Sequence, residues 1–169
     1  MEQILVTPER CLGCHSCELS CAVEHSPSKE LLAAVAGGEK TVPRVFVETD
    51  GKLNFPLQCR HCQEPACVYA CMSGALSKEE KTGKVVVSEE KCVGCWMCVM
   101  TCPFGAIIQG SDHKVIKKCD RCPDREEPAC TTACPTDAIQ FISVDQFSKD
   151  RRRKYLTVFN SQREEAEQL

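Results

Sequence analysis

The chain has 169 residues, of which sixteen are cysteine, and a formal net charge of −3. This length allows one compact domain or two very small ones that share a core, and the net negative charge argues against a nucleic-acid-binding protein. The longest bland apolar stretch, residues 31–38, is far shorter than the roughly 20 residues that cross a bilayer, so no direct membrane insertion is expected. Residues 1–10 carry neither a secretory nor a twin-arginine pattern, which favours a cytoplasmic protein whose cysteines bind metal rather than one another.

The cysteines fall into four groups of four, with none left over. In chain order the groups are Cys11, Cys14, Cys17 and Cys21; Cys59, Cys62, Cys67 and Cys71; Cys92, Cys95, Cys98 and Cys102; and Cys119, Cys122, Cys130 and Cys134. The third group has the C-x2-C-x2-C-x3-C-P spacing of bacterial ferredoxins. A loop with a cysteine at every third position can offer three sulfurs to one iron-sulfur cube, while its fourth cysteine reaches a neighbouring cube. The four groups therefore predict four [4Fe-4S] clusters.

The segment between the first and second groups, residues 22–58, is longer than the other connections and has two parts. Residues 28–36 predict a short helix that stops at Gly37 and Gly38. The alternation in residues 44–48 and the Asp50-Gly51 pair predict a β-hairpin. We expect this insertion to pack against the rest of the chain, and a surface that faces a partner is the alternative.

Short apolar strands follow the later cysteine groups. Residues 74–92 and 105–119 each predict a hairpin, and residues 137–144 supply a third copy of its first strand. The second and third groups begin 33 residues apart and are joined by a hairpin alone, as in a contiguous two-cluster ferredoxin. This spacing pairs the second group with the third and leaves the first group with the fourth.

The tail, residues 145–169, lies beyond the last cysteine group and supplies no ligand. Apolar residues within 155–159 lie between a basic start and an acidic end, so a helical or extended segment could present an apolar face. We expect a docking tail that attaches to a catalytic subunit or to a second copy of the chain. The alternative is a segment that folds back on the core. Its basic run, residues 151–154, is weak evidence for nucleic-acid binding because no aromatic stacking platform accompanies it.

Zinc is the main alternative to iron, because paired C-x2-C motifs also build four-thiolate zinc sites. Such zinc sites join two separate C-x2-C pairs and do not require a third and fourth cysteine in the same loop. A disulfide framework ranks lower, for lack of an export signal. His15 and His61 lie between ligand cysteines and are expected at the surface or beside the sites, because cysteine already fills each set. Trp96 is expected to pack near a cluster, and Lys117 and Lys118 are candidates for offsetting cluster charge.

Four motifs carry a resemblance to a known family: CLGCHSCELSC at 11–21, LQCRHCQEPAC at 57–67, CVGCWMCVMTCPFGAI at 92–107 and KKCDRCPDREEPACTTACPTDAI at 117–139. Over residues 3–144 the chain resembles the four-cluster electron-transfer subunits of the dimethyl sulfoxide reductase and formate hydrogenlyase type, including those associated with carbon monoxide dehydrogenase. The resemblance implies an α+β fold of two pseudo-symmetric, bacterial-ferredoxin-like dicluster units. One unit would hold residues 1–25 and 109–144, the other residues 55–108, with an insertion at 26–54 and the tail at 145–169.

The resemblance also implies how the cysteines are shared among the clusters. Each cluster would take three cysteines of one group and the fourth cysteine of the paired group. The implied sets are Cys11, Cys14, Cys17 and Cys134; Cys119, Cys122, Cys130 and Cys21; Cys59, Cys62, Cys67 and Cys102; and Cys92, Cys95, Cys98 and Cys71. The chain departs from many relatives at Met72, where they have proline, and this departure concerns the local turn more than the ligation.

The function that the resemblance implies is a non-catalytic electron relay. Its partner would be a catalytic oxidoreductase subunit: a molybdenum or tungsten enzyme such as formate dehydrogenase or aldehyde oxidoreductase, a carbon monoxide dehydrogenase, or a nickel or iron hydrogenase. A flavin protein or ferredoxin would be a further partner. A free-standing polyferredoxin is the alternative. An iron-sulfur sensor or assembly protein is a third class, and the complete ligand sets argue against it.

Overall fold

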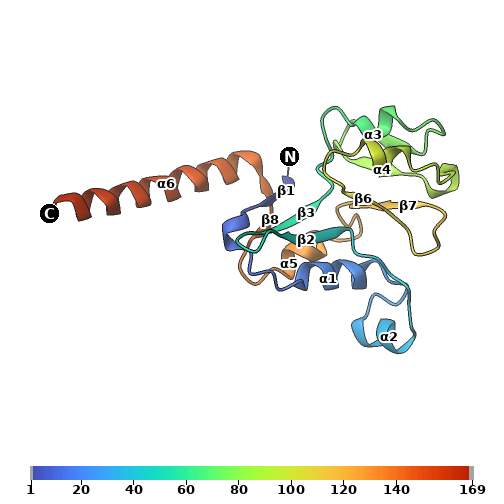
Figure 1. Ribbon diagram of the computed structural model, residues 1–169, viewed down its shortest axis with the longest axis horizontal. Helices are drawn as coiled ribbons and strands as arrows, with labels where there is room; N and C mark the ends of the chain where they lie inside the picture. Colours follow the sequence, from blue (N-terminus) through green and yellow to red (C-terminus); the bar gives the residue numbers. More distant parts are fainter. Residues whose placement is uncertain (1, 168–169) are drawn as a thin grey trace.

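A computed structural model describes the backbone of residues 2–167 and the side chains of residues 2–160. The strands are β1 Glu2–Val6, β2 Val45–Thr49, β3 Asn54–Gln58, β4 Leu76–Lys78, β5 Val85–Val87, β6 Ile107–Gln109, β7 Ile116–Lys118 and β8 Ile139–Ser143. The α-helices are α1 Ser16–Glu24, α2 Leu31–Ala36, α3 Ala66–Tyr69, α4 Met97–Thr101, α5 Ala129–Thr132 and α6 Val144–Glu167, and two 3-10 turns are η1 Pro8–Arg10 and η2 Glu89–Lys91. The described strands pair two by two, so the fold is a mixture of short hairpins and short helices (Figure 1).

Both predicted hairpins between the later cysteine groups are confirmed. Strand β4 pairs antiparallel with β5, and β6 pairs antiparallel with β7. The alanine that opens each repeat is buried in all three copies, at Ala75, Ala106 and Ala138. A side chain no larger than a methyl group fits these crowded positions at the start of each strand.

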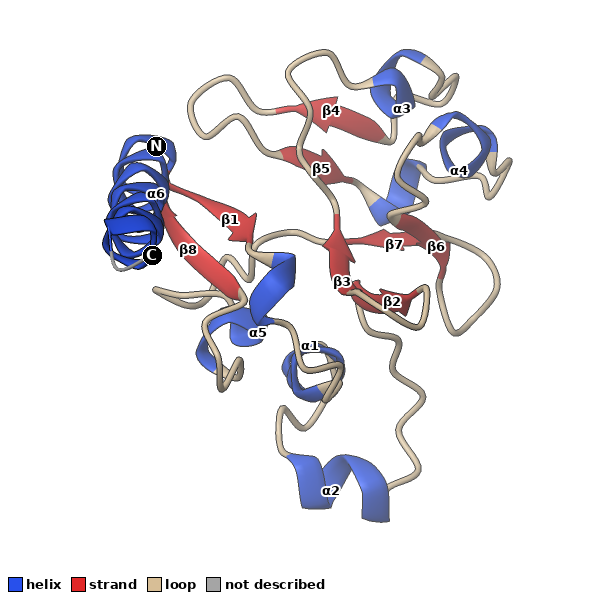
Figure 2. Cartoon of the chain, turned by 60° about the vertical axis from the view of Figure 1, so that its left-hand side comes forward, coloured by secondary structure: helices blue, strands red, loops and turns tan. Residues whose placement is uncertain are grey.

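The pairing partner of β8 is a strand that the sequence pattern does not predict. Strand β1 runs antiparallel to β8, with Val6 opposite Ile139 and Glu2 opposite Ser143. The two strands are far apart in the sequence, so no hairpin turn marks their pairing. This two-stranded sheet brings the first cysteine group close to the fourth (Figure 2).

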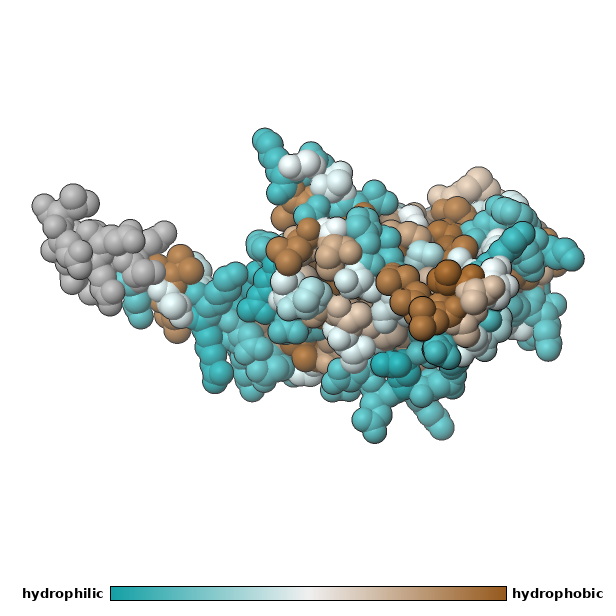
Figure 3. All heavy atoms as spheres, turned by 90° about the horizontal axis from the view of Figure 1, so that it is seen from below, coloured by the Kyte–Doolittle hydropathy of each residue, from teal (hydrophilic) through white to brown (hydrophobic). Residues whose placement is uncertain are grey.

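The insertion contains the predicted helix and the predicted hairpin. Helix α2 ends at Gly37, and β2 pairs with β3 across the Asp50-Gly51 turn, where the Asp50 carboxylate accepts hydrogen bonds from two backbone N–H groups. The hairpin packs as expected, with Val45 only 1% exposed. The packing role is wrong for α2, which has no buried residue and leaves Leu32 75% exposed. Seen from below, the surface in the region of α2 is apolar (Figure 3).

Two buried clusters form the interior, and both are rich in cysteine. The first core consists of Ile4, Cys17, Cys21, Val45, Cys119, Cys130 and Ile139. The second core consists of Leu76, Val85, Cys98, Ile107 and Ile116, with Cys67, Cys71, Cys92 and Cys102 packed against it. The buried thiols of the first core come from the first and fourth groups, with Cys59 of the second group packed against it, and the second core gathers thiols of the second and third groups.

The tail forms the long helix α6, which extends away from the rest of the molecule (Figure 1). Its first two turns lie against β1 and β8, where the Arg151 guanidinium pairs with Glu9 and contacts the ring of Phe147. Farther along, the described side chains up to residue 160 are exposed, including Tyr155 and Phe159, whose rings stack 6.3 Å apart. The first two turns of the tail therefore pack on the core, whereas residues 152–160 do not. No helix within residues 2–167 combines the length and apolar character needed to cross a bilayer.

Candidate metal centres

All sixteen cysteines are free thiols, so a disulfide framework is wrong for this structure. We divide them into four sites, which are described one by one below. These are site 1 (Cys11, Cys14, Cys17, Cys134), site 2 (Cys59, Cys62, Cys67, Cys102), site 3 (Cys92, Cys95, Cys98, Cys71) and site 4 (Cys119, Cys122, Cys130, Cys21). These are the sets that the family resemblance implies, with three cysteines of one group and the fourth cysteine of the paired group in each.

Site 1 surrounds a pocket in the first half of the fold. All four of its cysteines line this pocket, together with Leu12, His15 and Ile139. Burial raises the pKa of the Cys17 thiol to about 11, and the charge of Glu18 and that of the nearby Cys11 thiol add to this rise. Cys134 accepts a hydrogen bond from the Ala138 backbone N–H at 3.2 Å. Three thiols of the first group therefore face one thiol of the fourth.

Site 2 surrounds a second pocket, in the other half of the fold. Its four cysteines line the pocket with Arg60, Val85 and Phe104. Burial raises the pKa of Cys67 to about 11, with added repulsion from Cys59 and Cys102. The Arg60 guanidinium lies over the rings of Phe55 and Phe104, at 5.8 and 5.9 Å from their centroids. This contact joins the loops on two sides of the pocket.

Site 3 has the same mixture of burial as site 1, with one buried, two half-buried and one exposed cysteine. The pKa of Cys98 is raised by burial, and by the charges of Cys71 and Cys92. Burial also acts to raise the pKa of Cys71, but hydrogen bonds from the Leu76 and Ser73 groups outweigh it and lower the value. Cys95 lies exposed in the same loop. Met72, directly after Cys71, is 93% exposed and leaves the site unobstructed.

Site 4 is the most buried. Burial raises the pKa of Cys119 to about 12 and that of Cys122 to about 11, and nearby Cys21 raises both further. The pKa of Cys130 rises as well, through burial and then through Cys119 and Cys21. Cys21 therefore lies close enough to the other three thiols to repel each of them when they are thiolates. A thiolate at this depth needs positive charge beside it, and a bound metal supplies that charge.

The first and third groups share a backbone conformation that turns their thiols inward. A left-handed residue precedes the helix in each, His15 before α1 and Trp96 before α4, with φ values of 59° and 62°. Gly94 also has a positive φ, and a Cβ there would lie 2.5 Å from the Lys114 carbonyl oxygen. Only glycine fits this close approach. As expected, Trp96 packs against the second core.

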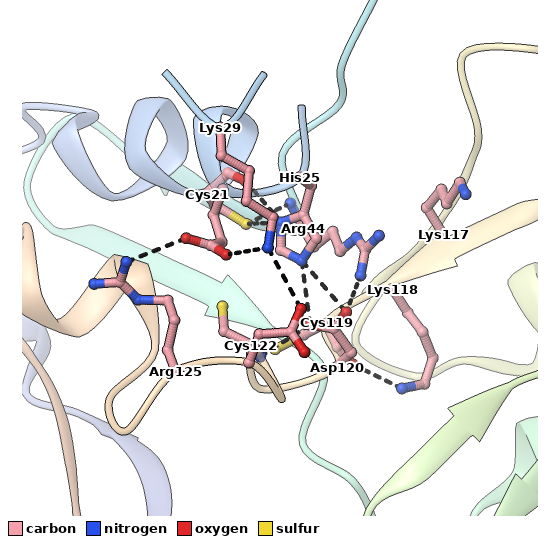
Figure 4. A network of polar contacts seen from close by, with 12 residues as sticks. Cys21, His25, Lys29, Arg44, Lys117, Lys118, Cys119, Asp120, Cys122 and Arg125 are labelled. Carbon is pink, nitrogen blue, oxygen red and sulfur yellow. Dashed lines mark hydrogen bonds and ion pairs between the residues drawn. The ribbon is translucent and has the colours of Figure 1, made fainter. Parts of the chain in front are cut away.

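A polar network surrounds the Cys21 sulfur of site 4 (Figure 4). The Arg44 backbone N–H donates to this sulfur at 3.2 Å, and the Arg44 guanidinium pairs with the Asp120 carboxylate. His25 lies with Nδ1 3.6 Å from the same sulfur and Nε2 3.2 Å from Asp120. Burial acts to lower the pKa of His25, but hydrogen bonds to Asp120 and Cys21 outweigh it and raise the value to about 9. No sequence pattern indicated Arg44 and Asp120, which lie 76 residues apart.

The two histidines between cysteines have different surroundings. His15 is largely exposed and its Nδ1 lies 3.0 Å from the Glu18 carboxylate. His61 is buried, and its Nδ1 accepts a hydrogen bond from the Val85 backbone N–H at 2.9 Å. Burial, followed by the charges of Lys118 and Arg121, lowers the pKa of His61 to about 3, so the ring is neutral. Neither contact involves a thiol, so the roles expected for both histidines, away from ligation, agree with these positions.

The donor chemistry fits iron-sulfur clusters. Each site gathers thiols alone, and thiolate is the ligand that holds [4Fe-4S] cubes. His25, Asp120 and Cys122 also lie close enough together to suggest a small mixed metal site. Cys122 belongs to site 4, however, and the His25 and Asp120 side chains are already paired with each other. The mixed cluster is therefore part of the surroundings of site 4.

Comparison with known proteins agrees with this chemistry. Residues 52–144 match the model of a 4Fe-4S dicluster domain, and residues 8–24 match that of a 4Fe-4S binding domain. An "Iron-sulfur protein" of Rhodospirillum rubrum is 39% identical, over 85% of this chain and 83% of its own. The "Electron transport protein HydN" of Escherichia coli is 32% identical, over 92% of this chain and 98% of its own. One chain of the "Anaerobic dimethyl sulfoxide reductase" of the same species is 35% identical, over 85% of this chain and 74% of its own.

Proposed function

We propose that this chain, which belongs to the 4Fe-4S dicluster family of electron-transfer proteins, is the iron-sulfur subunit of an oxidoreductase complex and carries four [4Fe-4S] clusters. The observation that carries the proposal is the exchange of fourth cysteines between groups. Cys134 lines the pocket of the first group, and Cys102 lines that of the second. Such an exchange is how two-cluster ferredoxins tie neighbouring clusters together.

The proposed ligand sets are sites 1 to 4 as defined above. Sites 1 and 4 would form one dicluster unit, from residues 1–25 and 109–144, and sites 2 and 3 the other, from residues 55–108. The two cysteine-rich cores support this division. Each bound cluster would accept and release one electron at a time. The chain would hold the clusters close together and adjust their potentials through N–H···S hydrogen bonds, burial and nearby charge.

The partner that we propose is a catalytic subunit. One relative is named as a chain of a reductase, and another as an electron transport protein. A molybdenum or tungsten enzyme, a carbon monoxide dehydrogenase or a hydrogenase would supply or consume the electrons, and a flavin protein or ferredoxin would stand at the other end of the relay. In this assignment the chain itself catalyses no reaction. The second candidate is a free-standing polyferredoxin that exchanges electrons with several enzymes.

Helix α6 favours the subunit over the free-standing carrier. Beyond the turns that contact β1 and β8, it exposes Leu156, Val158 and Phe159 to solvent. Apolar side chains on this part of the helix are separated from the main body by a hydrophilic stretch (Figure 3), which includes the basic residues 151–154. An amphipathic helix held away from its own core is a common means of binding a partner groove. We assign α6 as the docking tail for the catalytic subunit.

Truncation after Lys154 tests this assignment. The truncated chain keeps Phe147 and Arg151, which contact the rest of the fold, so its iron content and cluster spectra should match those of the full chain. In anaerobic native purification the full chain should bring along a protein that contains molybdenum, tungsten or nickel. The truncated chain should lose most of that protein, by tenfold or more.

A matched control separates the apolar contact from the length of the helix. The double variant Leu156→Ala, Phe159→Ala keeps the whole tail and should weaken the association nearly as much as truncation. A full-length chain that purifies alone, with all its iron, would favour the polyferredoxin. A second copy of the chain in the purified complex would assign the tail to self-association.

A further inference from the structure

Two cations are buried without a carboxylate partner. Lys118 and Arg121 are only 3% and 7% exposed, and within the described residues no ion pair joins either one to an acidic side chain. The Lys118 ammonium donates to the backbone carbonyls of Val85 and Cys119, the latter at 2.7 Å. Asp120 lies between them in sequence but pairs with His25 and Arg44 instead. Burial of an uncompensated cation is costly, so each is expected to face negative charge of another kind.

The groups beside Lys118 belong to two different sites, because its ammonium hydrogen-bonds the carbonyl of Cys119 in site 4 and the carbonyl of Val85, which lines the pocket of site 2. The charge of Lys118 acts to lower the pKa of Cys67 in site 2 and of Cys119 in site 4, against the larger effect of burial. Arg121 interacts with Cys59 of site 2 and, again, with Cys119. His61, which lies beside both cations, is neutral and supplies no negative charge. The cations therefore lie where the two halves of the molecule meet, between site 2 and site 4.

Contacts with the backbone fix the Lys118 ammonium in this position. Lys118 ends β7, and its ammonium spans from the Cys119 carbonyl beside site 4 to the Val85 carbonyl on β5. Lys117, the neighbour of Lys118, points away from it and pairs with Glu89 (Figure 4). Of these two adjacent lysines, Lys118 is therefore directed toward the region between sites 2 and 4, and Lys117 is directed away from it.

We propose that Lys118 and Arg121 are fixed counter-charges shared by sites 2 and 4, which set the potentials of the two clusters between which electrons cross from one half of the molecule to the other. This inference rests on the proposed function, because it requires clusters at both sites. In the crossing step one cluster loses one electron and the other gains it. Lys118 and Arg121 keep their protons throughout.

The expected direction follows from electrostatics. Reduction adds one negative charge to a cluster, so a nearby positive charge stabilises the reduced form and raises the potential. A cation placed between two clusters raises the reduction potentials of both. The difference in potential between the two clusters therefore stays small. Buried charges are screened much less by salt than exposed ones, so the effect should persist at high ionic strength.

The test is a redox titration of the holoprotein, followed by electron paramagnetic resonance, on Lys118→Met and Arg121→Met. In each variant two of the four clusters should become harder to reduce, and the other two should stay unchanged. At a fixed potential we expect about a tenfold lower ratio of reduced to oxidised cluster, which corresponds to about 59 mV for a one-electron couple. Arg121→Lys keeps the charge and should restore the potentials. Lys117→Met is the matched control and should shift none.

Iron content separates failure of this inference from failure of the proposed function. If each variant holds about sixteen iron atoms, from four cubes of four, and all four potentials stay at their original values, the inference is overturned. It is overturned equally if Arg121→Lys shifts the potentials as much as Arg121→Met, because packing rather than charge would then be responsible. If Lys118→Met loses iron, its potentials cannot be interpreted. The inference is then tested by the cluster potentials of Arg121→Lys and Arg121→Met alone. Absence of clusters from the unaltered chain would contradict the proposed function instead.

Discussion

Cys21→Ser should destroy or alter the cluster of Cys119, Cys122 and Cys130, although Cys21 belongs to the first cysteine group. Its thiol lies beside those three, and its charge raises the pKa of each of them. Serine is a poor substitute for thiolate as an iron ligand. Of the four cluster signals in the electron paramagnetic resonance spectrum, one should be lost or changed, with the loss of about a quarter of the iron expected for four equal cubes.

Double variants reveal which thiols share a cluster. Cys21→Ser combined with Cys122→Ser should lose no more than one cluster, because both residues serve site 4. Cys21→Ser combined with Cys17→Ser should lose two, although these residues lie in one helix, α1. If the second pair loses a single cluster instead, each group keeps its own four cysteines and the proposed exchange is wrong.

Removal of iron should unfold both halves of the molecule. Four of the seven buried residues in the first core are cysteines, so little apolar surface remains to stabilise the chain without metal. A structural metal contributes about 10–16 kcal/mol in small thiolate domains, which matches or exceeds the roughly 5–15 kcal/mol total stability of a typical domain. Anaerobic chelation under reducing conditions should therefore abolish the resistance of residues 2–143 to protease.

The control for this experiment is the same chelator added without the reductant, so that the clusters stay intact. That sample should stay resistant to protease and retain its visible absorbance. An iron-free chain that keeps its resistance and its circular dichroism would mean that the fold stands without the clusters. The cysteine-rich cores would then have to be stabilised by packing alone.

Local features were the ones that could be predicted from the sequence. The cysteine spacing, the Asp50-Gly51 hairpin and the end of α2 at Gly37 each depend on residues a few positions apart. The repeat of buried alanines likewise marked the hairpins that precede the third and fourth groups. These features are specified by short-range geometry, so their patterns are visible in one chain.

Features made by distant parts of the chain could not be predicted. Lys117 and Lys118 are adjacent in sequence, yet Lys117 pairs with exposed Glu89, and Lys118 is buried and donates to the Val85 and Cys119 carbonyls. Strand β1 pairs with β8 across nearly the whole chain. Arg44 and Asp120 meet beside Cys21 only because the insertion hairpin packs on the first core. Each depends on tertiary packing, which overrides local pattern.

The metal and sulfide content of the anaerobically purified chain tests the central claim most directly. Four [4Fe-4S] clusters predict about sixteen iron atoms and an equal amount of acid-labile sulfide per chain, because each cube holds four of each. Zinc should be present only in traces. Stoichiometric zinc without sulfide would contradict the account, since it would assign the sixteen thiols to structural sites that carry no electrons.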